Sequence, residues 1–125
     1  GNCHPKRDYI DVRDVADAIS AIATGLDEAP GVDVVNVGTG EAYSVCEVLT
    51  QVEQLIGEKL TVETDPARLR AVDRPVLRAS IAKVARKYGW SPALRLEDSL
   101  RSFCLDPEIP AELMARSWDR PTNIE

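Results

Sequence analysis

Arginines and carboxylates are concentrated in residues 65–77, which read Asp-Pro-Ala-Arg-Leu-Arg-Ala-Val-Asp-Arg-Pro-Val-Leu. Three arginines and two aspartates fall within these thirteen residues. Pro66 and Pro75 each fix their own φ angle and bias the preceding residue toward extended backbone. Because a guanidinium group offers paired donors that match phosphate oxygens, the stretch predicts a stiffened loop that binds a phosphorylated ligand. The alternative is a solvated loop whose arginines form surface ion pairs.

Arg7 and Tyr9 form a second candidate pair, in a short extended piece expected at residues 7–10. Side chains alternate along such a piece, so Arg7 and Tyr9 share one face, and Asp8 and Ile10 take the other. An arginine and an aromatic hydroxyl on one face suit a diphosphate. The alternative is an ion pair between Arg7 and a nearby aspartate, beside a half-buried tyrosine.

The glycine turn at residues 38–40 resembles a dinucleotide-binding loop at first sight, because it joins an expected strand to an expected helix. Tyr43 occupies the place of the third glycine of that motif. No second parallel strand with an acidic tip follows in the expected context. No cofactor-binding residue is therefore assigned.

Metal-ligand residue types occur at Cys3, His4, Cys46 and Cys104, but none of them forms a paired Cys-x-x-Cys or His-x-x-x-His element. No metal site is therefore predicted, and His4 is expected to be solvated rather than a catalytic base. Three cysteines, an odd number, favour thiols over a disulfide framework. A reducing cytoplasm is the expected compartment.

Length and charge restrict the remaining classes. A chain of 125 residues suffices for one domain with one core. The net charge of −6 argues against a nucleic-acid-binding surface, which needs a basic excess. No stretch approaches the ~20 consecutive apolar residues of a membrane span, and no signal peptide is recognised.

Four helices are expected from the apolar periodicity and the capping residues. They begin at Val12 after an Asp11 cap, at Val45 after the Ser44–Glu47 capping box, after a Ser80 cap, and at Leu96. Their expected ends are Gly25 or the 30–31 pair, Gly57, Gly89 and Cys104.

The faces expected to be buried follow the same periodicity. In the four helices in turn, they consist of Val12, Val15, Ala16, Ile19, Ile22 and Ala23; Val45, Val48, Leu49, Val52, Leu55 and Ile56; Ile81, Val84 and Ala85; and Leu96, Leu100 and Phe103. Strands are expected at residues 32–37 and 60–63. Residues 106–125 are expected to form a tail with a loosely docked helix.

Four stretches of the chain together resemble the GDP-4-keto-6-deoxy-mannose reductases, within the extended short-chain dehydrogenase family of nucleotide-sugar epimerases, dehydratases and reductases. They are residues 7–15, 36–40 and 65–77, and Lys83 followed by residues 89–92. The resemblance covers roughly residues 1–105. It implies an α/β fold: the small substrate-binding lobe of a Rossmann-type enzyme, with short strands and about four helices, lacking the N-terminal dinucleotide-binding core.

The same resemblance implies a nucleotide-sugar site. Arg7 and Tyr9 match the family residues that contact the nucleotide diphosphate. Arg70 matches a second such arginine, and Asp73 would reach the ribose. Arg68 is a further candidate contact. GDP-sugar or another nucleotide-sugar is therefore the expected ligand, and NAD(P) is the cofactor implied for the full-length relative but not for this chain.

The catalytic pair of that family is Tyr-x-x-x-Lys, and this chain lacks it. The residues four places after its three tyrosines, Tyr9, Tyr43 and Tyr88, are Arg, Glu and Pro. We therefore expect the C-terminal part of such an enzyme, inactive alone, with no catalytic residue of its own. Its uncovered apolar surfaces are expected to meet a missing N-terminal domain or another copy of the chain. The alternative is a non-catalytic interaction module that keeps the lobe fold without binding nucleotide.

Overall fold

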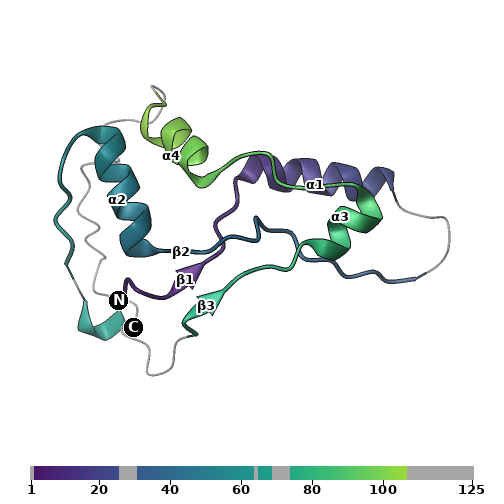
Figure 1. Cartoon of the computed structure of the whole chain (residues 1–125), viewed down its shortest axis with the longest axis horizontal. Helices are drawn as coiled ribbons and strands as arrows, with labels where there is room; N and C mark the ends of the chain where they lie inside the picture. Colours follow the sequence, from purple (N-terminus) through teal and green to yellow (C-terminus); the bar gives the residue numbers. More distant parts are fainter. Residues whose placement is uncertain (1, 26–30, 64, 69–73, 107–125) are drawn as a thin grey trace, which may run out of the picture.

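The computed structural model describes residues 2–25, 31–63, 65–68 and 74–106. The fold is α/β, as expected, with four helices and a three-stranded sheet in these residues (Figure 1). The elements are β1 (Lys6–Arg7), α1 (Val12–Thr24), β2 (Tyr43–Ser44), α2 (Val45–Ile56), β3 (Val76–Leu77), α3 (Ala82–Tyr88) and α4 (Leu96–Cys104). A short 3-10 turn covers Pro66–Arg68.

The sheet has the order β2-β1-β3, with β1 antiparallel to β2 and parallel to β3. Arg7 pairs with Tyr43 on one side and with Leu77 on the other. Two more backbone hydrogen bonds flank the parallel pair, from Lys6 N to Pro75 O (2.8 Å) and from Asp8 N to Leu77 O (3.1 Å). The end of the arginine-rich stretch therefore lies beside residues 6–8, although about seventy residues separate the two segments in sequence.

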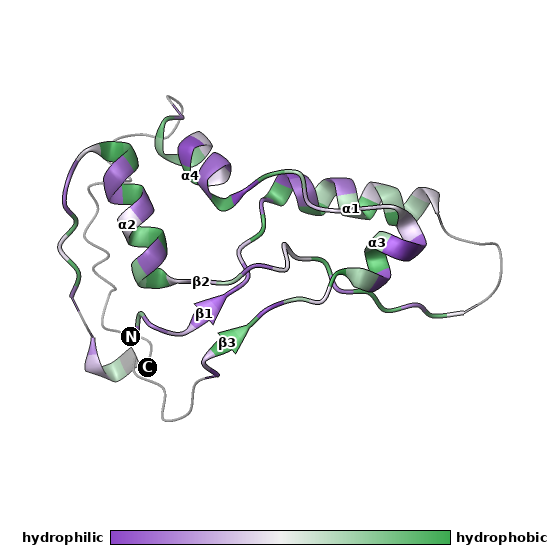
Figure 2. Cartoon of the chain, in the orientation of Figure 1, coloured by the Kyte–Doolittle hydropathy of each residue, from purple (hydrophilic) through white to green (hydrophobic). Residues whose placement is uncertain are grey.

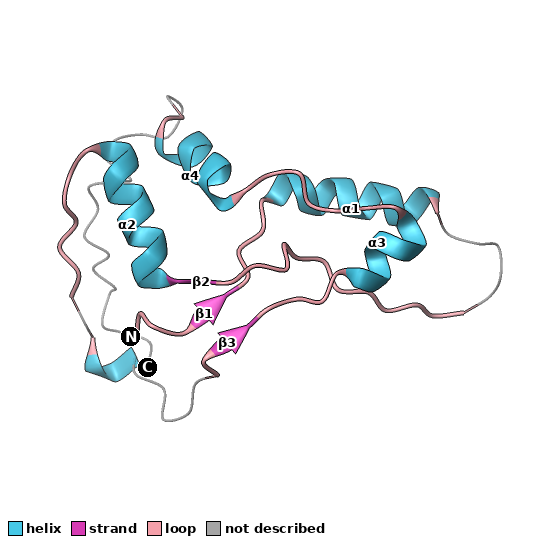
Figure 3. Ribbon diagram, viewed as in Figure 1, coloured by secondary structure: helices cyan, strands magenta, loops and turns pink. Residues whose placement is uncertain are grey.

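Several strand predictions were wrong. The strand expected at residues 7–10 covers only Lys6–Arg7, and residues 32–37 and 60–63 form no strand in the structure. Their sequences favour extended backbone, but within the described residues neither segment has a neighbour that completes a ladder. Conversely, β2 and β3 were not predicted, because two-residue strands arise from pairing with β1 rather than from a local pattern (Figure 3).

The buried core lies between α1 and α3 and consists of Ala18, Val84 and Trp90. At the other end of the molecule α2 packs on α4, and the sheet lies between the two pairs (Figure 1). The face predicted to be buried on α1 was wrong at four of its six positions: Val12 is 77% exposed, Ile19 is 63% exposed, and Ala16 and Ala23 are exposed as well. Figure 2 shows hydrophobic residues on more than one side of this helix.

Helix α1 begins after Asp11, whose carboxylate accepts from the backbone N–H of Arg13, and it ends at Gly25. Both boundaries confirm the sequence prediction. Helix α2 begins at the predicted capping box. Ser44 Oγ accepts from Glu47 N at 3.1 Å, while the Glu47 carboxylate accepts from Ser44 N at 2.7 Å. The pKa of Glu47 falls to about 2 because Lys6 and Ser44 donate to its carboxylate.

Replacing Ser44 by alanine is expected to lower the free energy of unfolding by about 1 kcal/mol, because the backbone N–H of Glu47 loses its acceptor. Urea unfolding of both proteins measures this difference. Thr50→Ala, in the middle of the same helix, is the control and should change stability by less than about 0.5 kcal/mol. Equal denaturant midpoints for Ser44→Ala and wild type would contradict the role of the capping box.

Helix α3 shows one wrong prediction and one confirmed prediction. Ser80 does not cap it, because the residue at the cap position is Ile81, which makes no side-chain cap bond. The predicted end is confirmed, since Gly89 has the left-handed φ of 66° that glycine adopts without strain. Val84, predicted to point inward, is fully buried.

Helix α4 has the predicted bounds, Leu96–Cys104. Its predicted buried face was wrong at Phe103, which is 60% exposed, while Leu96 and Leu100 are half-buried. The predicted tail helix lies in residues 107–125, outside the described residues. No helix within the described ranges is both long and apolar enough to cross a bilayer.

Cys3 and Cys46 form a disulfide, with their Cα atoms 5.4 Å apart, so the expectation of three free thiols was wrong for this pair. The antiparallel pairing of β1 with β2 brings the residues before β1 to the first turn of α2. That proximity depends on a contact between segments 43 residues apart, which cysteine spacing alone does not reveal. Cys104 is a free thiol.

Candidate functional site

Arg7, the first predicted site residue, connects β1 to the end of the 65–77 stretch. Its Nη1 atom donates to the carbonyl oxygen of Lys6 at 2.8 Å and to that of Arg74 at 3.0 Å. Arg7 is half-buried, so a planar guanidinium is held at the place where the arginine-rich stretch rejoins the sheet. The structure therefore brings Arg7 to this stretch.

Arg70 and Asp73, two further predicted residues, lie outside the described residues. Arg68 is the last residue of the 3-10 turn. Asp65 opens the stretch, and its carboxylate accepts from the backbone N–H of Ala67 at 2.9 Å. Both ends of the 65–77 stretch are thus locally organised, by this turn at one end and by β3 at the other.

Tyr9 lines a small cavity of about 140 Å³. Thr39, Glu41 and Tyr43 line it as well, together with residues 92–96. Arg7 is not among the lining residues, so the shared face predicted for Arg7 and Tyr9 does not bring both side chains to this cavity. The strand itself ends at Arg7.

Asp8 holds the turn beside these residues, a role that sequence reasoning missed. Its Oδ1 atom accepts from Thr39 N (2.8 Å) and Thr39 Oγ1 (2.6 Å). Its Oδ2 atom accepts from Gly40 N (3.0 Å) and Ala79 N (3.1 Å). Burial would raise the pKa of Asp8, but these hydrogen bonds outweigh it and hold the pKa below its usual value.

Gly38 is required by the close approach of this turn to its neighbours. A Cβ atom at this position would lie 2.5 Å from the Cβ of Ala79 and 2.9 Å from Oδ2 of Asp8. The glycines of the turn therefore let the backbone reach a carboxylate of the protein itself. The signal available in the sequence was the run of small residues at 38–40, whose N–H groups needed an acceptor.

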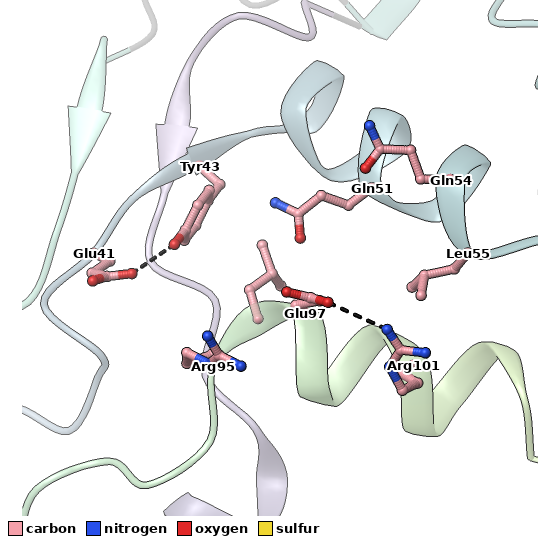
Figure 4. Close-up of a pocket in the computed structure, with 9 residues that line it drawn as sticks. Glu41, Tyr43, Gln51, Gln54, Leu55, Arg95, Glu97 and Arg101 are labelled. Carbon is pink, nitrogen blue, oxygen red and sulfur yellow. Dashed lines mark hydrogen bonds and ion pairs between the residues drawn. The ribbon is translucent and has the colours of Figure 1, made fainter.

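A larger cavity of about 410 Å³ lies between the β2 region, α2 and α4, and no sequence feature predicted it. Figure 4 shows its lining residues Glu41, Tyr43, Gln51, Gln54, Leu55, Arg95, Glu97 and Arg101, and Leu96 also lines it. Glu41, Tyr43, Arg95 and Leu96 line both cavities, so the Tyr9 cavity adjoins the larger one.

The charged groups of the larger cavity already pair with one another or with neighbours. Tyr43 donates to Glu41 at 2.6 Å, which raises the pKa of Tyr43. Arg101 pairs with Glu97 at 3.3 Å, and Arg95 pairs with Asp98 at 3.2 Å. This pairing leaves no excess of positive charge for an anion, and the cavity holds neither a nucleophile next to a base nor a pair of free carboxylates.

A family model for GDP-mannose 4,6-dehydratases matches residues 1–103.

The chain belongs to this family.

The family assignment confirms the resemblance inferred from the four sequence stretches. The GDP-6-deoxy-D-mannose reductase of Pseudomonas aeruginosa is 30% identical over 108 residues, which cover 86% of this chain and 34% of that protein. The UDP-glucose 4-epimerase of Bifidobacterium longum, solved with NAD+ and UDP, superposes with a TM-score of 0.70 at 34% identity. That superposition covers 78% of this chain and 28% of the epimerase.

A second solved relative is the UDP-glucose 4-epimerase of Thermotoga maritima with UDP-glucose, at a TM-score of 0.70 and 26% identity. That superposition covers 83% of this chain and 32% of the epimerase. The chain thus spans about a third of the length of the relatives it matches. Those relatives are nucleotide-sugar enzymes, and the part that they share with this chain has the α/β fold described above.

Proposed function

We propose that this chain is the nucleotide-sugar-binding part of an NAD(P)-dependent GDP-sugar reductase, epimerase or dehydratase. Arg7, Tyr9, Arg68, Arg70 and Asp73 are the proposed substrate contacts. The two arginines at positions 7 and 70 bind the diphosphate, and the Asp73 carboxylate accepts from a ribose hydroxyl. Membership in the family and the nucleotide-sugars named for its solved relatives support this proposal.

The observation that carries the proposal is the hydrogen bond from Arg7 Nη1 to Arg74 O at 3.0 Å. Arg74 is only four residues from Arg70 in sequence, and its carbonyl oxygen lies beside Arg7. Four residues span at most ~14 Å of backbone, so we propose that the Arg70 side chain reaches the same diphosphate as Arg7. This supports convergence of Arg7 and Arg70 on one ligand.

Arg70→Ala is expected to weaken GDP binding by about 1.5–3 kcal/mol, or roughly 10- to 150-fold, because charge-assisted hydrogen bonds to phosphate are lost. Arg70→Lys should restore only part of the affinity, since an ammonium group cannot reproduce the guanidinium fork. Isothermal titration calorimetry with GDP measures both variants. The wild-type affinity is expected to be modest, because the chain spans only about a third of the length of its nucleotide-sugar-binding relatives.

Arg74→Ala is the matched control, from the same stretch and with the same loss of charge. The side chain of Arg74 is not a proposed contact, and its structural interaction with Arg7 uses the backbone carbonyl, which alanine retains. Arg74→Ala should therefore change GDP affinity less than Arg70→Ala does. Equal losses in the two variants, or no GDP binding by the wild type at millimolar ligand, would contradict the proposed nucleotide site.

The isolated chain is proposed to be inactive, and NAD(P) is proposed to bind elsewhere in the full-length protein. The sequence holds no Tyr-x-x-x-Lys pair. Without an acid/base group and a positioned hydride donor, the chain cannot catalyse hydride transfer. Positioning of the reactants alone lowers the barrier of such a reaction by ~7–11 kcal/mol. A rate of NADPH oxidation with a GDP-4-keto sugar that increased in proportion to the concentration of the pure chain would contradict this.

The cytoplasmic location is also a proposal.

A non-catalytic interaction module is the second candidate, and exposed apolar side chains favour it. Val12 and Ile19 of α1 are exposed, and Val32 and Val34 are largely exposed in the segment after the helix. Apolar surface of this kind tends to be covered by a partner. We propose that it meets either a further domain of the same protein or another copy of this chain. If the wild-type chain does not bind GDP but does self-associate, that result would favour the interaction module.

A further inference from the structure

Cys3, His4 and Cys46 form a cluster that the nucleotide site does not use. One ligand atom from each, the two sulfur atoms and an imidazole nitrogen, lie within 4.8 Å of one another. The cluster connects the segment before β1 to the first turn of α2, and Cys46 N also donates to Cys3 O at 3.3 Å. A disulfide requires only the two cysteines, so the proximity of an imidazole is a separate observation.

The separations in the cluster suit a tetrahedral metal ion. With Zn–S near 2.3 Å and Zn–N near 2.0–2.1 Å, neighbouring ligand atoms in a tetrahedral site are about 3.6–3.8 Å apart. The imidazole nitrogen must move slightly closer than the 4.8 Å limit, and the two sulfur atoms, bonded in the disulfide, must move apart after reduction; side-chain rotations of His4 and the two cysteines allow both changes. His4 is exposed, and its imidazole has no hydrogen-bond partner within the described part of the chain, so it is available to reorient.

The electrostatic setting favours a negatively charged ligand set. Cys46 is the second residue of α2, where the positive end of the helix dipole stabilises negative charge. The charged pair Lys6 and Glu47 lies next to it and is internally compensated. Cys3 and Cys46 are half-buried while His4 is exposed, so three protein ligands face a position open to solvent.

We propose that the chain with Cys3 and Cys46 reduced binds one thiophilic divalent metal ion, Zn²⁺, through Cys3, His4 and Cys46, with solvent as the fourth ligand. A phosphine and one water reduce the disulfide: the phosphorus supplies two electrons, and the water supplies both thiol protons and the oxygen of the phosphine oxide. Each thiol then releases its proton to solvent as its sulfur binds the metal. The disulfide form shown here and the metal form exclude one another, because the same two sulfur atoms take part in both.

Cobalt(II) titration of the full, phosphine-reduced chain tests the proposal, because thiolate-to-cobalt charge transfer gives a near-ultraviolet band. The expected result is one Co²⁺ per chain, displaced by Zn²⁺, and no band in the oxidised chain. Cys46→Ser should abolish the band. His4→Ala should weaken binding by about tenfold or more. Because the His4 side chain is exposed and unpartnered among the described residues, this variant leaves the fold intact.

Cys104→Ser removes the free thiol outside the cluster and is the matched control, with unchanged stoichiometry and affinity expected. At the same zinc concentration, zinc should also raise the unfolding temperature of the reduced wild type by more than that of His4→Ala, which reports binding independently of the absorption band. The proposal is overturned if the reduced, folded chain shows no charge-transfer band, if the band survives Cys46→Ser, or if His4→Ala binds as tightly as wild type.

Discussion

Asp14→Ala is expected to destabilise the protein by about 3–4 kcal/mol. Asp14 lies in the first turn of α1, is only 2% exposed, and accepts from two backbone N–H groups, those of Ala93 and Leu94, both at 3.0 Å. Alanine leaves both part-buried donors without their shared acceptor. Because single domains are stable by only ~5–15 kcal/mol, this is a large share of the total. Chemical unfolding of both proteins measures it.

Asp17→Ala, one turn further along the same helix, is the control, because Asp17 is exposed. It should change stability by less than about 0.5 kcal/mol. Asp14→Asn should lie between the two, since the amide keeps one acceptor but directs its N–H₂ group at the other backbone donor. Similar midpoints for Asp14→Ala and Asp17→Ala would show that the two hydrogen bonds to Asp14 contribute little.

Asp8→Ala is expected to destabilise the protein by about 2–4 kcal/mol, because three backbone N–H groups and the Thr39 hydroxyl lose their common acceptor. Thr39→Val removes one of the four hydrogen bonds and should cost about 1 kcal/mol. Urea unfolding at neutral pH separates the two variants. Equal effects would mean that the carboxylate does not organise the 38–40 turn.

The Asp8 effect should also depend on pH. The pKa of Asp8 is lowered in the folded protein, so its carboxylate stabilises the fold above the usual aspartate pKa of ~3.9. That contribution is lost as the pH falls through the lowered folded-state value. The difference between wild type and Asp8→Ala should therefore be constant near neutral pH and shrink only in acid. A difference that vanished near pH 6 would contradict this assignment.

Local sequence signals predicted the helices well. The Ser44 and Glu47 capping box, the Asp11 cap, and the glycines at 57 and 89 act within one turn of the backbone, so their effect is readable from nearby residues. Ser80 was the exception. A serine before an apolar helix is a reasonable cap, but the chain enters α3 one residue later.

The sheet and the buried faces were harder to predict because they depend on contacts between distant segments. Residues 32–37 have the β-branched composition of a strand but no ladder neighbour in the described structure. Residues 76–77 form β3 because β1 lies beside them, despite the preceding proline. Val12 and Ile19 fit the periodicity of a buried face, yet that face remains uncovered in this chain.

Arg7 and the 65–77 stretch of the candidate site were predictable both from residue chemistry and from the family resemblance. The resemblance identified Arg7 and the 65–77 stretch, and the hydrogen bond from Arg7 to Arg74 O is consistent with their proximity. Asp8 and Asp14 were not predicted as acceptors for backbone N–H groups. Their roles as acceptors for backbone groups up to 80 residues away have no local signature.

Hydrogen–deuterium exchange of the wild-type chain with and without GDP tests the central claim most directly, namely that two distant segments form one nucleotide site. The predicted result is slower exchange in residues 6–9 and 65–77, with little change in α2 and α4, which line the larger cavity. Protection confined to α2 and α4, or no protection at saturating GDP, would contradict the proposed site.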